Sequence, residues 1–144
     1  ANQWMVELGL EIRYPPRHDD FIDECKAAGQ TRPTPLILRY DTGGYNTLHQ
    51  DLYGEKYFPF QVVFVLSKRG FDYSGGEFVL VEQIPRAQSR CHVLTPDVGD
   101  AIIFTTNFRS VKGARYYRAA MKHGISEVTS GRRHALGVIF HDAT

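Results

Sequence analysis

The sequence has few of the features that mark secreted or membrane proteins. Only two cysteines, Cys25 and Cys91, occur in its 144 residues, too few for the disulfide framework of a small secreted domain. We expect both to be free thiols in a reducing, cytoplasmic compartment. No apolar run approaches the roughly 20 residues that cross a bilayer, and no signal-peptide pattern opens the chain.

Several catalytic patterns are also missing. The chain has no G-x-S-x-G nucleophile elbow, no phosphate-binding G-x-x-x-x-G-K loop and no paired-cysteine zinc spacing. These absences exclude the common signatures of serine hydrolases, P-loop nucleotide hydrolases and zinc fingers.

The chain has the size of one domain and is long enough to bury a core. Its 42% hydrophobic and 23% charged residues are ordinary for a globular protein, and 12% aromatic residues favour a β-rich interior. We expect residues 1–144 to form a single domain, with helical support in 1–30 and a β core in 34–144. Because the chain opens on Ala1 rather than Met, we also expect the whole protein to continue on the N-terminal side.

Helical signals are confined to the first thirty residues. Apolar spacing from Trp4 to Ile12 suits the end of a helix. A second helix is predicted to begin near His18, to be capped by Asp19 or Asp20, and to stop at Gly29.

The pattern then changes to short β-type runs separated by turn residues, among them Gly131. The predicted strands are Leu36 to Tyr40, Phe60 to Ser67, Glu77 to Glu82, Ala101 to Thr105 and His134 to Phe140. Many short strands without intervening helices favour a sandwich or jelly roll over an alternating α/β fold. The sequence therefore predicts a mainly β fold with N-terminal helices.

Two H-x-D pairs could contribute to a metal site, His18–Asp20 and His49–Asp51. Residues i and i+2 of a strand share a face, so an imidazole and a carboxylate there can bind one ion. Two histidines and one carboxylate occupy one face of an octahedral ferrous ion and leave three positions open. The pattern alone is weak, because about one comparable chain in three contains it by chance. His18 falls on a predicted helix start, where i and i+2 diverge, which favours the second pair.

Four further motifs occur in a fixed order through the β region. They are RYDTGGYNTLHQD at 39–51, SGGEF at 74–78, PDVGDAIIF at 96–104 and HGISEVTSGRR at 123–133. In this order they resemble the iron(II)- and 2-oxoglutarate-dependent oxygenases, especially the prolyl-4-hydroxylase-like branch. The likeness spans 36–142 and is greatest to a bacterial group whose members have been described, by analogy, as oxygenases acting on damaged DNA.

The resemblance implies a double-stranded β-helix, or jelly-roll, core that forms the catalytic domain of a dioxygenase. His49, Asp51 and His123 would hold Fe(II), and 2-oxoglutarate and O2 would be the co-substrates. Such an enzyme couples oxidative decarboxylation of 2-oxoglutarate to hydroxylation or oxidative demethylation of its substrate, while the protein binds and aims the reactants. Without the motif, His123 would be an ordinary half-buried histidine.

The resemblance also implies which residues hold 2-oxoglutarate. Arg133 suits the distal carboxylate because a guanidinium offers a planar pair of donors that stays charged, and Tyr40 can donate a hydroxyl hydrogen bond. Strand alternation favours Arg133 over Arg132 as the inward residue, although a slip of one residue would exchange them. Prolyl hydroxylases commonly have lysine at this position, which bears on the substrate class. By itself, Tyr40 could be a core tyrosine.

The remaining histidines are expected outside the metal site. His92 falls in a predicted polar loop. His134 and His141 flank the last predicted strand on opposite faces, as surface or wall residues.

Net charge is only +1, but it is unevenly distributed. The segment from Arg109 to Arg133 contains seven basic residues and one acidic residue, Glu127, so its net charge is +6. The basic residues are Arg109, Lys112, Arg115, Arg118, Lys122, Arg132 and Arg133. Such an excess can attract an anionic partner, although solvated surface charge is the commoner explanation.

These observations leave three functions open. Oxidative demethylation of nucleic acid is favoured by the Arg109–Lys122 segment, whose cations and tyrosines can track phosphates and stack bases. Hydroxylation of a prolyl-type protein side chain or a small molecule would need a groove between loops Tyr53–Phe60 and Arg109–Tyr117. A jelly-roll metal-binding module without catalysis is the non-enzyme alternative. No oligomeric state follows from the sequence, and no membrane partner is indicated.

Overall fold

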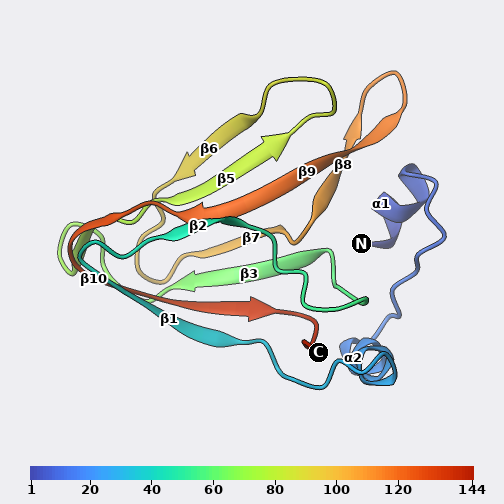
Figure 1. Cartoon of the computed structure of the whole chain (residues 1–144), viewed down its shortest axis with the longest axis horizontal. Coiled ribbons are helices and arrows are strands. Elements are labelled where there is room, and N and C mark those ends of the chain that lie inside the picture. Colours follow the sequence, from blue (N-terminus) through green and yellow to red (C-terminus); the bar gives the residue numbers. More distant parts are fainter.

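The computed structural model describes all 144 residues and consists of two facing antiparallel sheets with two short helices (Figure 1). The helices are α1 (Asn2–Glu7) and α2 (His18–Ala27). The strands are β1 (Leu36–Asp41), β2 (Asn46–His49), β3 (Phe60–Val65), β4 (Tyr73–Gly75), β5 (Phe78–Gln83), β6 (Arg90–Leu94), β7 (Ala101–Thr105), β8 (Phe108–Lys112), β9 (Tyr116–Ile125) and β10 (Val128–Ile139).

Strands distant in the sequence lie side by side in each sheet. One sheet has the order β1-β10-β3-β7, with β4 also paired to β10. The other has the order β2-β9-β5-β6, with β8 also paired to β9. The sheets meet at the end where β9 leads into β10 and diverge toward the end that holds both helices (Figure 1). This architecture confirms the predicted jelly-roll fold class.

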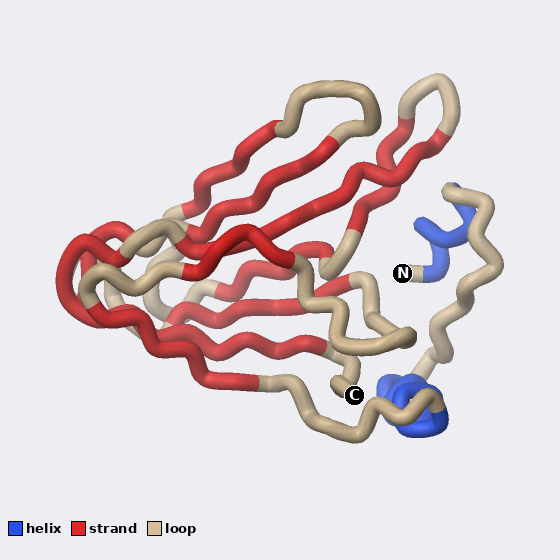
Figure 2. The backbone as a smooth tube through the Cα atoms, in the orientation of Figure 1, coloured by secondary structure: helices blue, strands red, loops and turns tan.

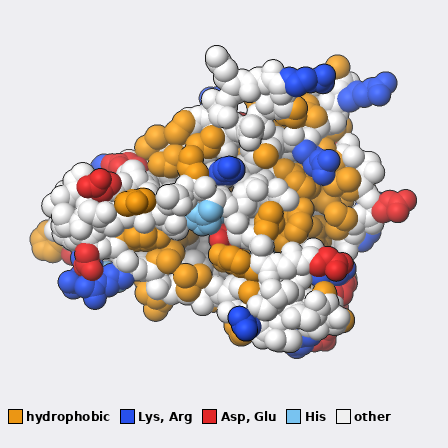
Figure 3. All heavy atoms as spheres, viewed as in Figure 1, with side chains coloured by type: hydrophobic (Ala, Val, Ile, Leu, Met, Phe, Trp, Pro, Cys, Tyr) orange, Lys and Arg blue, Asp and Glu red, His pale blue; other side chains and the backbone are white.

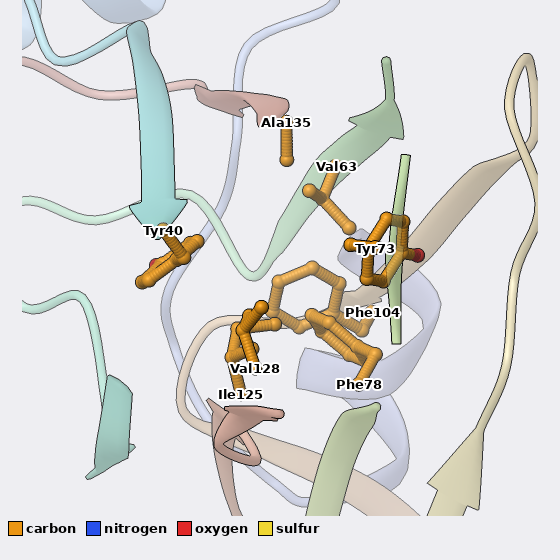
Figure 4. Packing of buried hydrophobic residues seen from close by; sticks show 8 residues of the cluster. All are labelled: Tyr40, Val63, Tyr73, Phe78, Phe104, Ile125, Val128 and Ala135. Carbon is orange, nitrogen blue, oxygen red and sulfur yellow. The ribbon is translucent and has the colours of Figure 1, made fainter. Parts of the chain in front are cut away.

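Apolar side chains from both sheets fill the space between them. The main cluster comprises Tyr40, Val63, Tyr73, Phe78, Phe104, Ile125, Val128 and Ala135 (Figure 4). Phe78 and Phe104 come from opposite sheets and meet edge to face, with ring centroids 4.9 Å apart. Aromatic pairs of this geometry add to the stability that their burial provides.

The helices form a second, smaller core at the open end of the sheets. Phe21 and Cys25 of α2 are buried with Met5 of α1 and Phe108 of β8. Helix α1 ends at Glu7, so the predicted helical segment was too long.

The beginning of α2 also differs from the prediction. Its N-cap is Arg17, which has an extended backbone and no side-chain cap bond, so neither Asp19 nor Asp20 caps the helix. The two acids instead lie in the first turn, where the helix dipole favours them. Gly29, at a φ of +79°, follows the helix as predicted.

Five strands agree with the prediction in place, and five were not predicted. The missed strands β2, β4, β6, β8 and β9 are short or carry charged residues on exposed faces, which hides their period of two. His92 lies on β6 rather than in a loop. Residues 109–117, predicted as a loop, instead comprise most of β8, the turn and the start of β9. Strand β10 begins at Val128, because Gly131 lies inside it at a φ of +78° rather than in a turn.

Both cysteines are free, as predicted, with Cys25 buried and Cys91 exposed. Neither helix has the length and apolar composition needed to span a bilayer.

Candidate active site

The three side chains predicted as metal ligands converge between the sheets. His49 is the last residue of β2 and pairs across the sheet with His123 of β9. Asp51 lies beyond the strand end, so the H-x-D pair does not share a strand face as expected; a turn of the chain brings the carboxylate to the imidazoles. One ligand atom from each residue lies within 4.8 Å of the others.

The hydrogen bonds of this cluster leave its ligand atoms facing one another. Nε2 of His123 is 3.1 Å from Oδ2 of Asp51, and Nε2 of His49 is 3.5 Å from Oδ1. Nδ1 of His49 lies 2.6 Å from the carbonyl oxygen of Thr47. A carbonyl only accepts, so Nδ1 carries the proton and directs Nε2 toward the cluster, the tautomer that a metal ligand requires.

Charge in the cluster is concentrated on Asp51, which is buried, as is His123. Burial alone would raise the pKa of Asp51, but hydrogen bonds from His123, His49 and Tyr53 outweigh it and hold that pKa below its ordinary value. The hydrogen bond to Asp51 raises the pKa of His49. The cluster of Asp51 and the two histidines therefore favours an ionised carboxylate next to positive charge. A divalent cation can supply that positive charge in place of the protons on the imidazoles.

Arg133 faces the same space from β10 in the other sheet. It is 1% exposed, and none of its three guanidinium nitrogens has a hydrogen-bond partner. The rings of Tyr40 and Tyr73 lie 5.8 and 5.9 Å from its Cζ. Arg132 instead points outward and binds Asp41 at 2.6 Å, which confirms the predicted orientation of the pair.

A buried charge without a partner is costly, so the setting of Arg133 indicates an anionic ligand. Arg133, Tyr40 and the three cluster residues line one cavity of about 100 Å³. Planar carboxylates suit a guanidinium because two parallel hydrogen bonds can form. The cavity therefore fits a small dicarboxylate, with one end at Arg133 and a chelating end at the histidine–aspartate cluster.

Gly76 makes room for the guanidinium. At a φ of +62° it is in a region that other residues rarely adopt, and a Cβ there would lie 2.9 Å from Cδ of Arg133. The second glycine of the SGGEF motif, residues 74–78, is thus tied to the position of Arg133.

Sequence reasoning missed two residues that hold Asp51. The hydroxyl of Tyr53 donates to Oδ1 at 2.6 Å. His141 is 1% exposed; its Nδ1 accepts from the Phe58 amide at 3.3 Å, so Nε2 carries a proton and donates to the Asp51 carbonyl at 3.1 Å. Burial lowers the pKa of His141, in keeping with a neutral ring. Of the two positions predicted for His141, surface or wall, the surface position was therefore wrong.

Gln50, which lies between His49 and Asp51 in the sequence, is also held by hydrogen bonds. The side-chain amide of Gln50 donates to the carbonyl oxygens of Asn107 at 2.7 Å and Met121 at 2.9 Å. These bonds close the junction where β2 ends and β8 begins along the edge of β9. The loop that follows, residues 50–59, runs toward the C-terminus (Figure 2), where the Thr144 amide donates to the Tyr53 carbonyl at 3.0 Å.

Two other histidines lie outside the cluster, as expected. His92 is 3.7 Å from Glu82, and the His134 amide donates to Ser67 at 2.9 Å. His18 lies at the surface near the Phe140 carbonyl, so the first H-x-D pair takes no part in the site.

Solved structures of oxygenases share this fold. A 2-oxoglutarate–Fe(II) oxygenase family protein from Burkholderia pseudomallei matches with a TM-score of 0.53 and 21% identity, over 79% of this chain and 49% of that one. A prolyl-4-hydroxylase from Pseudomonas putida matches with a TM-score of 0.52 and 15% identity, over 85% of this chain and 59% of that one. At these identities the likeness defines the fold: the jelly roll used by 2-oxoglutarate oxygenases.

The sequence comparison is more specific. Residues 1–143 match the family described as an oxygenase catalysing oxidative methylation of damaged DNA, and the chain belongs to this family. Two uncharacterised proteins of Mycobacterium tuberculosis, MT2286 and Rv2227, are each 51% identical to it over 144 residues. The match covers 99% of this chain and 62% of each relative, so the chain spans less than two thirds of their length.

Proposed function

We propose that this chain is the catalytic domain of an Fe(II)- and 2-oxoglutarate-dependent dioxygenase. His49, Asp51 and His123 hold the iron, and Arg133 with Tyr40 holds the distal carboxylate of 2-oxoglutarate. The observation that carries the proposal is that an unpaired, buried guanidinium and a two-histidine, one-carboxylate set line the same cavity. This combination matches the needs of a metal-chelating dicarboxylate.

The residues of this chain bind and orient the reactants. When bound, iron and 2-oxoglutarate would supply the oxidising chemistry with O2, and 2-oxoglutarate would be decarboxylated to succinate. Tyr53 donates to Oδ1 of Asp51, so Oδ2, which lies 3.1 Å from Nε2 of His123, is the oxygen that would ligate the iron. His141 and Gln50 hold the backbone around Asp51 in place, so the ligand set is formed in advance. Phe78 and Phe104 line the cavity and restrict the access of water.

For the substrate we propose an N-methylated base in nucleic acid. The description of the family names damaged DNA, and the basic residues of β8 and β9 offer a surface for phosphates. An oxygenase has no methyl donor, so the expected reaction oxidises the methyl group. The hydroxymethyl product then releases formaldehyde and leaves the demethylated base, while one O2 and one 2-oxoglutarate give one succinate and one CO2.

Succinate formation tests this substrate class. N-methylated single-stranded DNA should stimulate turnover of 2-oxoglutarate with ferrous iron and ascorbate, with formaldehyde released in a 1:1 ratio to succinate. Unmethylated DNA of the same sequence is the control and should leave the slow uncoupled rate unchanged. Equal rates with both DNAs would reject nucleic-acid demethylation, and stimulation by a prolyl peptide or a small molecule instead would favour the hydroxylase alternative.

The space left by Gly76 yields a separate prediction about co-substrate binding. Gly76→Ala is expected to raise the KM for 2-oxoglutarate about tenfold, because the new methyl group displaces Arg133. Gly70→Ala is the matched control: Gly70 also has a positive φ, +76°, but a Cβ there meets nothing within 4 Å. Both variants should lose about 1 kcal/mol of stability through backbone strain. Steady-state kinetics should show the KM change in the first only; similar KM values would refute the packing role of Gly76.

A further inference from the structure

The structure divides the seven basic residues of 109–133 into two groups. Three are already engaged: Arg109 binds the buried carboxylate of Glu82 at 2.6 Å, Arg132 binds Asp41, and Arg133 lies in the cavity. The other four form no ion pair with any carboxylate of the chain and all belong to the β8–β9 hairpin. They are Lys112, Arg115, Arg118 and Lys122.

The cations on the strands point to one face of the sheet. In the antiparallel register Lys112 pairs with Tyr116 and Ser110 with Arg118, and paired residues share a face. Residues two apart also share a face, which adds Lys122. His123 belongs to the opposite face, which is turned toward the interior. From Tyr116 to Lys122 the row is roughly 20 Å long at the usual strand rise, and Arg115 extends it around the turn.

Along the sheet, no carboxylate lies next to Lys122 on this face, and at the start of β8 the same face carries Phe108, which is buried with Met5 of α1. The outward neighbours of Lys122 across the sheet are Val81 and then Cys91, whereas Glu82 faces inward and is occupied by Arg109. The guanidinium of Arg118 lies 5.6 Å from the ring centroid of Phe108, a contact that orients it without neutralising it. Figure 3 shows Lys and Arg side chains projecting from the surface at the end of the molecule that holds the tip of this hairpin.

A row of unpaired cations that includes an exposed aromatic ring suits a polyanion with stackable groups. Tyr116 is 40% exposed, and base–aromatic stacking is tolerant of sequence. The cavity of about 100 Å³ cannot enclose a base pair. Enzymes that act on bases take them from single strands or flip them out of a duplex.

We infer that the outer face of the β8–β9 hairpin binds the phosphate backbone of single-stranded nucleic acid. Its four free cations contact phosphates, and Tyr116 stacks on a base. The strand then passes over the β2–β8 edge of the sheet to present one base to the cavity. This inference rests on the proposed nucleic-acid substrate and adds the surface and the strandedness.

Binding of fluorescein-labelled, unmethylated single-stranded DNA, followed by anisotropy over a range of salt concentrations, tests the inference. The test variant carries Lys112→Gln, Arg115→Gln and Arg118→Gln. The control variant, with Arg17→Gln, Arg32→Gln and Arg86→Gln, loses the same charge at exposed positions elsewhere. Each lost phosphate contact lowers the slope of log K against log salt by about 0.7 for single strands. The test variant should therefore bind at least tenfold more weakly, with a slope smaller by about 2, and the control should match wild type.

Each outcome of the binding experiment either supports or overturns the inference about the hairpin. Equal weakening of the two variants would show an effect of net charge and overturn the inference, as would an unchanged slope or tighter binding of wild type to anionic phosphatidylserine vesicles. Uncoupled turnover of 2-oxoglutarate by the test variant should equal that of wild type, which checks that it is folded. If wild type shows the hairpin-dependent slope but methylated DNA gives no formaldehyde, the surface stands and the demethylation proposal fails.

Discussion

Replacing Arg133 by methionine is expected to weaken co-substrate binding strongly and, at the same time, to stabilise the protein. Two charged hydrogen bonds to a carboxylate contribute about 3 kcal/mol together, so the KM for 2-oxoglutarate should rise by about 100-fold or more. The guanidinium is buried without a partner in the free protein. Replacing such a charge with an apolar side chain of similar size should therefore raise the free energy of unfolding by about 1 kcal/mol or more.

Arg132→Met is the matched control, because its side chain leaves the same strand on the opposite face and pairs with exposed Asp41. It should change the KM by less than twofold and stability by at most about 0.5 kcal/mol. Titration calorimetry with 2-oxoglutarate and denaturant unfolding measure the two effects. If Arg133→Met were destabilising and bound 2-oxoglutarate normally, the guanidinium would serve the core rather than a ligand.

Of all the substitutions described, Asp51→Ala should cause the largest loss of metal affinity. The change removes a ligand and leaves two imidazoles, so affinity for Fe(II) should fall beyond the roughly 10- to 100-fold loss that follows removal of a hydrogen-bond partner outside the ligand set. Uncoupled turnover should fall with it. Anaerobic titration with Fe(II), or with Mn(II) followed by electron paramagnetic resonance, measures the affinity directly.

The other H-x-D pair supplies the control for this experiment. Asp20→Ala removes the equivalent carboxylate from His18–Asp20, which lies in the exposed first turn of α2. Metal affinity should stay at the wild-type value, and stability should fall by about 0.5 kcal/mol through the weaker helix-dipole interaction. Equal metal affinities of wild type, Asp51→Ala and Asp20→Ala would show that the cation binds elsewhere.

The sequence predicted the features that follow from short local patterns of residues, but it did not predict the side chains that hold the site in place. Turn residues and β-type runs sufficed for the fold class, and the motif resemblance selected residues 49, 51, 123 and 133, which the structure brings to one cavity. Strand alternation also placed Arg133 inside and Arg132 outside. The fold class and the orientation of the arginine pair depend on local periods, which are visible in a single chain, whereas the site residues were selected by the resemblance to a known family.

The hydrogen bonds that hold Asp51 could not be predicted in this way. His141 and Tyr53 hold Asp51 from the C-terminal segment and the loop after β2, and no local period marks such partners. Strands β8 and β9 were missed because lysine, arginine and tyrosine on an exposed face hide the alternation. That error also concealed which cations are free, since only the register shows that Arg109 is paired with Glu82 while Lys112 and Arg118 point away from it.

The jelly roll explains how distant segments form one site. Strands β2 and β9 are neighbours in one sheet and contribute the histidines, while β10 of the facing sheet contributes the guanidinium. Residues of the loop 50–59 are fixed to α2 and the C-terminal segment by Gln30, whose amide donates to the Asp142 carbonyl at 2.5 Å and to the Lys56 carbonyl at 2.9 Å. The Asp51 carboxylate, near the start of this loop, is therefore positioned by contacts from several parts of the domain.

An anaerobic crystal structure of the domain with Mn(II) in place of Fe(II), and with 2-oxoglutarate, tests the central claim most directly. We predict one metal ion bound by Nε2 of His49, Nε2 of His123 and one oxygen of Asp51, with a carboxylate of 2-oxoglutarate on Arg133. A metal ion bound away from these three side chains, or 2-oxoglutarate bound without contact to Arg133, would contradict the account.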